Sequence, residues 1–407
     1  MTHSNQKKSL AGLALCTLLA VTGCGSTDDV APFVNQGSNN PVTPVPVASL
    51  RTFFFVATNN ATNGIQVFSV DPAGNVSAAP VLTRTVTNAG VNQAPLGLAV
   101  SPDKRFLVAT TAVGLTSFAI SGSGAAISLT QVNANAVPAS SGTPQGSIII
   151  EDGSAAGAFG DSNNNIEGFT LSPAGAITVS ATRGTSFVTQ SSLGITNVGG
   201  NDIVVGLAGG SVIAFTLNSA TGAVTDQSAG TNLNSNFFAG STAVAALGNS
   251  LVIGNNGNAI AVQIIGANNA LTGGGNDVIT TGTQPNGVAA LQLAGLNVGT
   301  GLAATNNAAG ANVQLFTIAG NAPTLSVQAT SGVAAAALSV VAAARTLANG
   351  SNPSALVVVT NAAATNNVTP FQTDGFSTLS GAGLSSGTAT SISTITSNNS
   401  ALADFLF

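Results

Sequence analysis

The sequence is poor in the residue types that most active sites use. It has no Trp and no Tyr, one His and two Cys, and charged residues make up only 5% of it. The single histidine, His3, lies in the N-terminal segment, so no histidine is left for a Ser-His-Asp triad or a metal site in the rest of the chain. Basic clusters are missing too, so there is no phosphate-binding stripe, and without Trp and Tyr there is no typical stacking platform for bases. We expect no nucleic-acid partner and no cofactor.

An apolar run, an Asn/Gly/Thr turn and a second alternating run recur seven times in the same order. The copies begin near Thr52, Arg105, Ala155, Asn201, Asn249, Gly299 and Ser354. A period of roughly 45–50 residues corresponds to one four-stranded unit per repeat, as in a β-propeller blade. Apolar residues alternate with small or polar ones, as half-buried strands require. The sequence therefore predicts an all-β protein, a seven-bladed β-propeller of four-stranded blades.

Short anchor segments precede the repeats and set their register. The clearest are Pro95-Leu96-Gly97, Pro144-Gln145-Gly146 and Pro285-Asn286-Gly287. The first hairpin has no anchor before it, and the last anchor, near Gly387, is followed by no full repeat. We therefore predict a ring in which a C-terminal strand near residues 390–396 joins the N-terminal strands of residues 52–86, because closure removes exposed sheet edges. Ala401–Phe407 does not fit this scheme, since it competes with the first strand for one place.

The N-terminal segment has the order of a bacterial export signal. Lys7 and Lys8 precede the apolar stretch Leu10–Val21, which is too short to span a bilayer as a mature helix. The stretch ends in Val21-Thr22-Gly23-Cys24, which resembles the lipobox of bacterial lipoproteins. The resemblance implies a signal peptide over residues 1–23 and lipidation of Cys24, with several acyl chains giving stable anchoring. The alternative is an ordinary signal peptide with an incidental cysteine.

Residues 24–50 combine Asp, Asn and Pro in a composition that cannot form a core. We predict that they form a flexible tether between the lipid and a propeller domain over residues 51–407. Gly25, rather than Asp, follows Cys24. By resemblance to lipoprotein sorting in Gram-negative bacteria, this implies the outer membrane, with the propeller on its periplasmic or surface face.

Two repeats carry a further resemblance. TFFFVATN from Thr52 and PLGLAVSPDKRFLVAT from Pro95 resemble the YVTN repeats of bacterial β-propellers. The order of anchor, Ser-Pro-Asp turn and apolar strand is also similar to the lactonase-like propellers related to 6-phosphogluconolactonase. The family's usual tyrosine is replaced by Phe54 and Leu107. Some members hydrolyse sugar lactones and many have no assigned reaction, so the resemblance implies a fold without choosing a reaction.

Few residues offer catalytic chemistry. A lactonase would need a carboxylate base and an arginine as oxyanion partner, for which Glu151, Asp152 and Arg183 are the best available set. Solvated turn residues are the favoured interpretation of all three. Ser385 stands in a G-x-S-x-G pattern, but it has no histidine partner and lies in a Gly/Ser turn.

Two segments resemble calcium loops. Asp161, Asn163 and Asn165 space oxygen ligands as an EF-hand loop begins, but Ile166 stands where that loop needs glycine and the closing Glu is missing. Gly273–Asp277 resembles one turn of a calcium-binding repeat, yet it occurs in a single copy. A hairpin turn and a loop are the favoured interpretations, and we expect no bound metal.

These observations favour a non-catalytic, lipid-anchored module of the cell envelope, for interaction or surface display. Its partners would be the membrane, through the lipid on Cys24, and an envelope protein or small ligand at the propeller face. The alternative is a lactonase-like hydrolase acting on a sugar lactone. A glycan-binding protein is disfavoured, because sugar sites usually stack on Trp or Tyr and only Phe is present.

Overall fold

The computed structural model describes residues 52–58, 60–71, 75–123, 126–151, 155–185, 189–198, 200–208 and 211–226, and between 241 and 393 the strands bounded below with a few residues beside them. The chain divides into two compact units, Met1–Val47 and Ala48–Phe407, and every described residue belongs to the second. Cys24, the tether and Ala401–Phe407 lie outside the described residues. Within the described ranges all regular structure is β-strand, which confirms the all-β prediction, and no membrane-spanning helix is found there.

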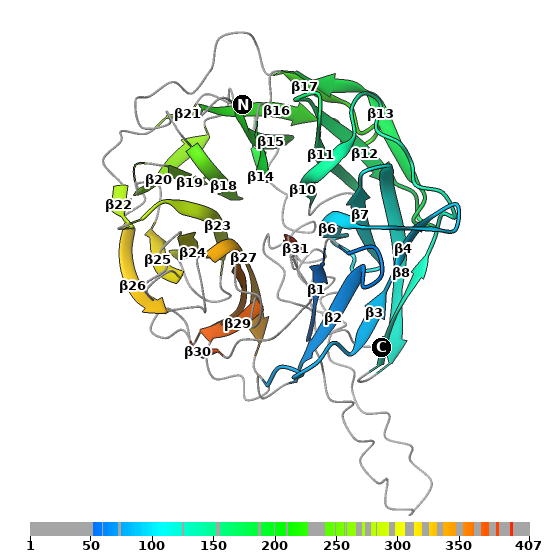
Figure 1. Ribbon diagram of the computed structural model, residues 1–407. Helices are drawn as coiled ribbons and strands as arrows, with labels where there is room; N and C mark the ends of the chain where they lie inside the picture. Colours follow the sequence, from blue (N-terminus) through cyan, green and yellow to red (C-terminus); the bar gives the residue numbers. More distant parts are fainter. Residues whose placement is uncertain are drawn as a thin grey trace, which may run out of the picture. The chain divides into compact units, whose positions relative to one another are not determined.

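The strands form one small hairpin and a series of larger sheets, which we number 1 to 7 in chain order (Figure 1). Sheet 1 contains β31 (Ser391–Ser393), β1 (Thr52–Ala57), β2 (Ile65–Val70) and β3 (Leu82–Arg84), and the small hairpin is β4 (Val86–Asn88) with β5 (Val91–Gln93). Sheet 2 contains β6 (Pro95–Val100), β7 (Phe106–Thr111), β8 (Gly114–Ser123) and β9 (Ala126–Gln131). Sheet 3 contains β10 (Pro144–Ile150), β11 (Ala156–Asp161), β12 (Ile166–Leu171) and β13 (Ile177–Gly184). Sheet 4 contains β14 (Thr189–Val198), β15 (Asn201–Ala208), β16 (Ser211–Leu217) and β17 (Val224–Asp226).

The remaining sheets repeat this order. Sheet 5 contains β18 (Ser241–Leu247), β19 (Ser250–Asn255), β20 (Ala259–Ile265), β21 (Leu271–Thr272) and β22 (Val278–Thr280). Sheet 6 contains β23 (Pro285–Gln292), β24 (Val298–Thr305), β25 (Val313–Ala319) and β26 (Leu325–Ser331). Sheet 7 contains β27 (Ala337–Thr346), β28 (Pro353–Asn361), β29 (Val368–Thr373) and β30 (Ser380–Gly381). Every pair of neighbouring strands within these sheets is antiparallel, so the apolar–turn–apolar copies of the sequence are the central hairpins of the sheets.

The first strand of each sheet lies beside the first strand of the next. We call β31, β6, β10, β14, β18, β23 and β27 the first strands. Contacts join them in this order, and β27 in turn contacts β31. Figure 1 shows these strands turned towards the middle of the ribbon and the last strands at the outside. At the two ends of the domain, β31 pairs antiparallel with β1, with Val56 opposite Ile392.

The anchor segments open the first strands, and their glycines permit close approach between sheets. In β6 the register shifts between Pro95 and Gly97, and β23 has a shift at the same place. A Cβ on Gly97 would lie 2.8 Å from the carbonyl carbon of Gly146 in the neighbouring first strand, and closer still to its oxygen. The hydroxyl of Thr110 donates to the Gln145 carbonyl at 2.7 Å, across the same junction.

The hydrophobic core lies between successive sheets. Phe106 and Val108 of sheet 2 form one cluster with Ile150, Phe159 and Phe169 of sheet 3. The rings of Phe159 and Phe169 are 6.3 Å apart between centroids and tilted by 47°. Burial of each such side chain contributes about 1.5–3 kcal/mol. Similar clusters join sheets 1 and 2, 4 and 5, and 5 and 6, so the core is distributed over the junctions.

Candidate functional site

Two buried carboxylates stand at one end of sheet 3. Asp161 ends β11 and Glu167 is the second residue of β12, so the hairpin turn between the two strands brings them to the same end of the sheet. The Asp161 Oδ1 accepts the backbone N–H groups of Asn163 at 2.8 Å and Asn165 at 2.9 Å. Asn164 takes the left-handed conformation, with φ of 62°, which tightens the turn. The chain can reverse direction here because the short side chain of Asp161 accepts the backbone N–H groups of the turn itself.

The connection from sheet 2 to sheet 3 runs over this hairpin and donates to both carboxylates. The Ser140 N–H donates to Glu167 Oε2 at 2.6 Å and the Ser141 N–H to Oε1 at 2.9 Å. Asp161 Oδ2 accepts the Ser141 hydroxyl at 2.6 Å and the Gly142 N–H at 3.0 Å. All four carboxylate oxygens therefore accept hydrogen bonds from the protein's own chain.

The environments of the two carboxylates push their pKa values apart. Both side chains are fully buried, with 0% exposure. Burial acts to raise the pKa of Asp161, but hydrogen bonds from Ser141 and Asn165 outweigh it and hold that pKa at about 2. Burial raises the pKa of Glu167 above its usual range, and the neighbouring Asp161 carboxylate raises it further, against the opposing hydrogen bonds from Ser140.

Carboxylates with separated pKa values are the pattern of an acid–base pair in many enzymes. Here the two groups have no exposed surface, and each oxygen already accepts a hydrogen bond from the connection or the turn. A general acid or base must come within hydrogen-bond reach of its substrate. The geometry therefore supports a role in holding the connection on sheet 3.

The two asparagines among the candidate calcium ligands use their side-chain nitrogens in this network. The amide nitrogen of Asn165 donates to Asp161 Oδ2 at 3.0 Å and to the Ser141 hydroxyl at 2.7 Å. The amide nitrogen of Asn163 lies 3.4 Å from the same hydroxyl. Within the described part of the chain, no three or more His, Cys, Asp or Glu side chains come close enough to hold a metal ion. The segment is a hairpin turn, and the similar segment Gly273–Asp277 lies outside the described residues.

The structure does not bring together the set that sequence reasoning selected for catalysis. Glu151 is buried and follows β10, where its N–H donates to the Ala156 carbonyl at 2.9 Å. Arg183 is exposed near the end of β13 and stands opposite Glu167 in register. Sheet 3 has its β10–β11 turn at one end and Arg183 at the other. The length of β11 separates them by about 17 Å at about 3.4 Å per residue. Asp152 and Ser385 lie outside the described residues.

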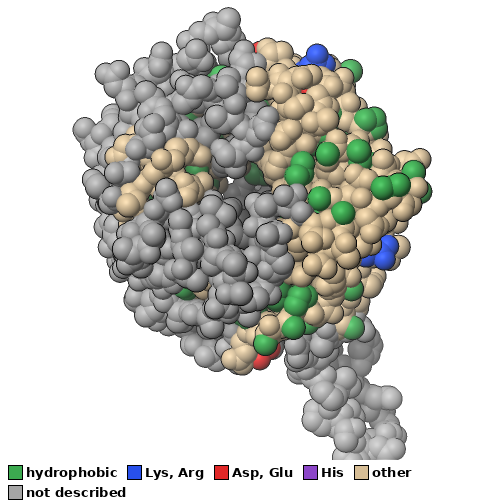
Figure 2. All heavy atoms as spheres, in the orientation of Figure 1, with side chains coloured by type: hydrophobic (Ala, Val, Ile, Leu, Met, Phe, Trp, Pro, Cys, Tyr) green, Lys and Arg blue, Asp and Glu red, His purple; other side chains and the backbone are tan. Residues whose placement is uncertain are grey.

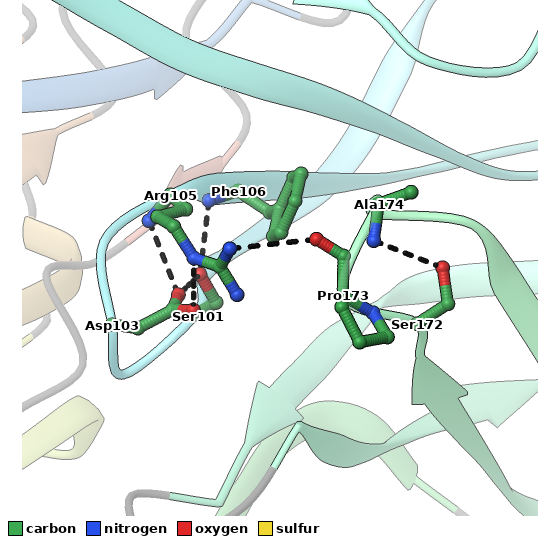
Figure 3. A network of polar contacts seen from close by, with 7 residues as sticks. All are labelled: Ser101, Asp103, Arg105, Phe106, Ser172, Pro173 and Ala174. Carbon is green, nitrogen blue, oxygen red and sulfur yellow. Dashed lines mark hydrogen bonds and ion pairs between the residues drawn. The ribbon is translucent and has the colours of Figure 1, made fainter.

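A second polar network joins sheets 2 and 3 at the opposite ends of their strands (Figure 3). In the Ser-Pro-Asp turn, the Ser101 hydroxyl donates to Asp103 at 2.6 Å and accepts the Phe106 N–H at 2.9 Å. The Arg105 Nε donates to Asp103 at 2.6 Å, and its Nη1 lies 3.4 Å from the Pro173 carbonyl of sheet 3. The guanidinium also stands 5.3 Å from the centre of the Phe106 ring. The turn residues of this motif thus fasten one sheet to the next.

The first strands carry very little charge. Within the bounds given above they contain no Asp, Glu, Lys or His, and Arg345 near the end of β27 is their one charged residue. Figure 2 shows Lys, Arg, Asp and Glu only at isolated places on the coloured part of the visible face. Within their bounds, the first strands themselves therefore supply no carboxylate, lysine or histidine that could move a proton.

Glu167 and its donors were missed by sequence reasoning. Glu167 lies 27 and 26 positions from the two serines whose amides it accepts. A single sequence does not reveal such a contact, because it depends on how the connection returns over the hairpin. One signal was present, namely a glutamate at a position that strand alternation buries, with a second acid at the start of the same turn.

Comparison with known proteins supports the fold and leaves the reaction open. No protein-family model matches the sequence, and no curated protein is found to resemble it. Among solved structures, a candidate 6-phosphogluconolactonase from Bacteroides fragilis superposes with a TM-score of 0.58 at 14% identity, over 87% of this chain and 99% of that one. A second candidate 6-phosphogluconolactonase, from Bacteroides uniformis, gives 0.55 at 11% identity over 85% and 99%. A protein from Lactobacillus plantarum gives 0.55 at 15% identity over 84% and 98%. These similarities show a propeller-type fold.

Proposed function

We propose that this chain is a lipid-anchored β-propeller of the cell envelope that works by binding, as an interaction or surface-display module. The observation that carries the proposal is the composition of the first strands, which hold one arginine and no carboxylate, lysine or histidine. Hydrolysis of a lactone needs a group that can take or give a proton near the reacting carbonyl. A surface of backbone, hydroxyl and apolar groups is suited to recognition.

The proposed architecture is a ring of seven blades, sheets 1 to 7, closed between β31 and β1. The contacts of each first strand with the next support it, and so does the pairing of Val56 with Ile392. Closure of this kind leaves no open edge to a neighbouring copy, which suits a protein concentrated at a membrane. A face of this ring would bind an envelope protein or a small ligand.

The proposed anchor is the lipid on Cys24, with residues 24–50 as the tether and the outer membrane as the destination. The support is the order of basic, apolar and Val-Thr-Gly-Cys segments at the N-terminus. Cys24→Ser should move the protein from the membrane fraction to the soluble fraction and out of the detergent phase. Cys16→Ser is the matched control, because Cys16 lies inside the segment that cleavage would remove. Equal partition of Cys24→Ser and the parent would refute the anchor.

The binding role is tested with the purified domain as bait. Pull-down from envelope extracts should recover a partner whose capture saturates and is competed by free domain. If bait and an unrelated acidic protein recover the same material across all fractions, the interaction role fails.

The alternative is a lactonase-like hydrolase acting on a sugar lactone, which is favoured by the likeness in fold alone. A panel of aldonolactones with purified protein separates the two functions. We expect no hydrolysis above background, and no change on Glu151→Gln or Arg183→Ala. A robust rate that disappears in either variant would establish the hydrolase instead.

A further inference from the structure

The connection into sheet 3 presents four consecutive backbone N–H groups to acceptors of one hairpin. We call residues 140–143 the amide strap. In order, its four N–H groups donate to Glu167 Oε2 at 2.6 Å, Glu167 Oε1 at 2.9 Å, Asp161 Oδ2 at 3.0 Å and the Ser162 hydroxyl at 2.9 Å. Successive N–H groups that converge in a turn form a cradle for negative charge. In this chain the cradle holds carboxylates of the protein itself.

The amide strap is fitted closely to the hairpin. A Cβ on Gly142 would lie 2.6 Å from the Ser162 hydroxyl and 2.9 Å from the Asn163 nitrogen, so only glycine lets the strap approach this far. The Thr143 carbonyl accepts the Ser162 N–H at 2.9 Å, which closes a reciprocal pair. The Ser141 hydroxyl adds a side-chain donor to Asp161 at 2.6 Å. The amides of the strap and the two carboxylates therefore satisfy one another's hydrogen bonds.

The same place in sheet 6 also contacts the connection that precedes its sheet. In sheet 3, Glu167 stands opposite Phe159. Phe159 lies two residues before Asp161, and Asp161 pairs with the anchor residue Pro144. In sheet 6, Gln314 stands opposite Ala303. Ala303 lies two residues before Thr305, and Thr305 pairs with the anchor residue Pro285. The Gln314 amide nitrogen donates to the Thr281 carbonyl, just before β23, at 2.9 Å. One position of the repeat thus ties a sheet to its incoming chain twice, with opposite hydrogen-bond polarity.

We propose that the amide strap is an anion cradle whose resident anion is the Asp161–Glu167 pair, and that this pair is the latch that fixes the connection between sheets 2 and 3. The strap packs against the hairpin because its amides donate to charged carboxylate oxygens there. Removal of the Glu167 carboxylate should leave the cradle intact but empty, so that it accepts a small carboxylate from solution. The Gln314 junction has no such cradle, since there the side chain is the donor.

Amide hydrogen exchange of the full-length protein tests the proposal. In Glu167→Ala we expect exchange of the segment that contains Ser140 and Ser141 to rise about tenfold or more, the loss expected for hydrogen bonds to a charged group. Acetate should slow it again in a saturable manner. Glu167→Gln retains one acceptor oxygen and fills the space, so it should show a smaller rise and no acetate effect. Gln314→Ala is the matched control, and it should change exchange near Thr281 alone, with no response to acetate.

Three results would overturn the latch. One is exchange of the amide strap in Glu167→Ala that stays at the parent rate. Another is an equal rise over the whole of sheet 3, which would mean that Glu167 supports the fold generally. The third is a raised exchange that acetate does not slow, or that chloride slows equally at the same ionic strength. If Glu167→Ala does not fold, Glu167→Gln and Gly142→Ala replace it, because either should loosen the strap selectively.

Discussion

The close approach of β6 and β10 gives a sharp test of how the sheets pack. Gly97→Ala adds one methyl group at a place where the nearest atoms are backbone atoms of Gly146. The new Cβ would stand 2.8 Å from the Gly146 carbonyl carbon and closer still to its oxygen, against an optimal separation of about 3.5–4.0 Å. Gly97 does not take a left-handed conformation, so the change brings no backbone strain of its own.

The loss of unfolding free energy in Gly97→Ala depends on which atoms must move to make room for the new methyl group. Backbone cannot rotate away as a flexible side chain does, so sheets 2 and 3 must separate along their shared junction. Overpacking of this kind costs about 1–3 kcal/mol. Alanine also lowers the entropy of the unfolded chain relative to glycine, which offsets about 0.4–1 kcal/mol. We expect a net loss of about 1–2 kcal/mol.

Gly146→Ala is the matched control, because it adds the same methyl group to the partner strand. Gly146 is exposed, and its Cβ would meet the Leu96 carbonyl oxygen at 3.2 Å and the carbonyl carbon at 3.9 Å. The unfolded-state contribution is the same in both variants, so their difference isolates the clash. Urea unfolding of both variants, with the midpoint and the slope compared, measures that difference. Equal stabilities would refute the packing of β6 against β10 described here.

Three further predictions concern electrostatics and closure. The low pKa of Asp161 contributes stability that is fully present above pH 3.8, its usual pKa, and is lost as pH falls towards about 2. The raised pKa of Glu167 contributes stability that is fully present below pH 4.5, its usual pKa, and is lost as pH rises through the raised pKa of the folded protein. As pH rises above 4.5, the melting temperature of Glu167→Gln should therefore fall less than that of the parent, because glutamine does not ionise. An identical fall in both proteins would contradict this. Deletion of residues 388–407 removes β31 and should cause aggregation or a large fall in melting temperature, whereas an unchanged melt would place closure elsewhere. Arg105→Ala should cost less than about 1 kcal/mol in chemical unfolding, because Arg105 and its partner Asp103 are 57% and 45% exposed; a larger loss would mean that the contact with sheet 3 dominates.

Much of the fold was accessible from local patterns. The central hairpins were predicted because Phe55 and Val67, now opposite each other, lie in runs that alternate around a turn. The anchors were found as Pro-x-Gly segments, although their reason, the close approach of Gly97 to the next first strand, is a contact across 49 positions. The C-terminal strand was predicted near residues 390–396 and is β31 at Ser391–Ser393.

The candidate site was much less accessible. Glu151 and Arg183 were grouped because a lactonase needs a carboxylate base and an arginine, but β11 separates the ends of the sheet at which they stand. Asp161 was considered as a metal ligand and stands in a turn, where nitrogens of Asn163 and Asn165 face it. Spacing along the chain gives the oxygen-bearing residues, but it does not give which atom of an amide points inward.

The sequence by itself determined the β-strand content, the repeat period and the poverty of charge, because each follows from residue types at short spacing. Only the tertiary structure decided which carboxylates are buried, which amides they accept and which strands pack against each other. The hydrogen bonds from the strap to the two carboxylates join residues 19 to 27 positions apart, and their geometry depends on how a connection crosses a neighbouring sheet. Burial beside Asp161 raises the pKa of Glu167. The crossing connection also gives Glu167 its role, because Glu167 accepts the amides of the chain that enters sheet 3.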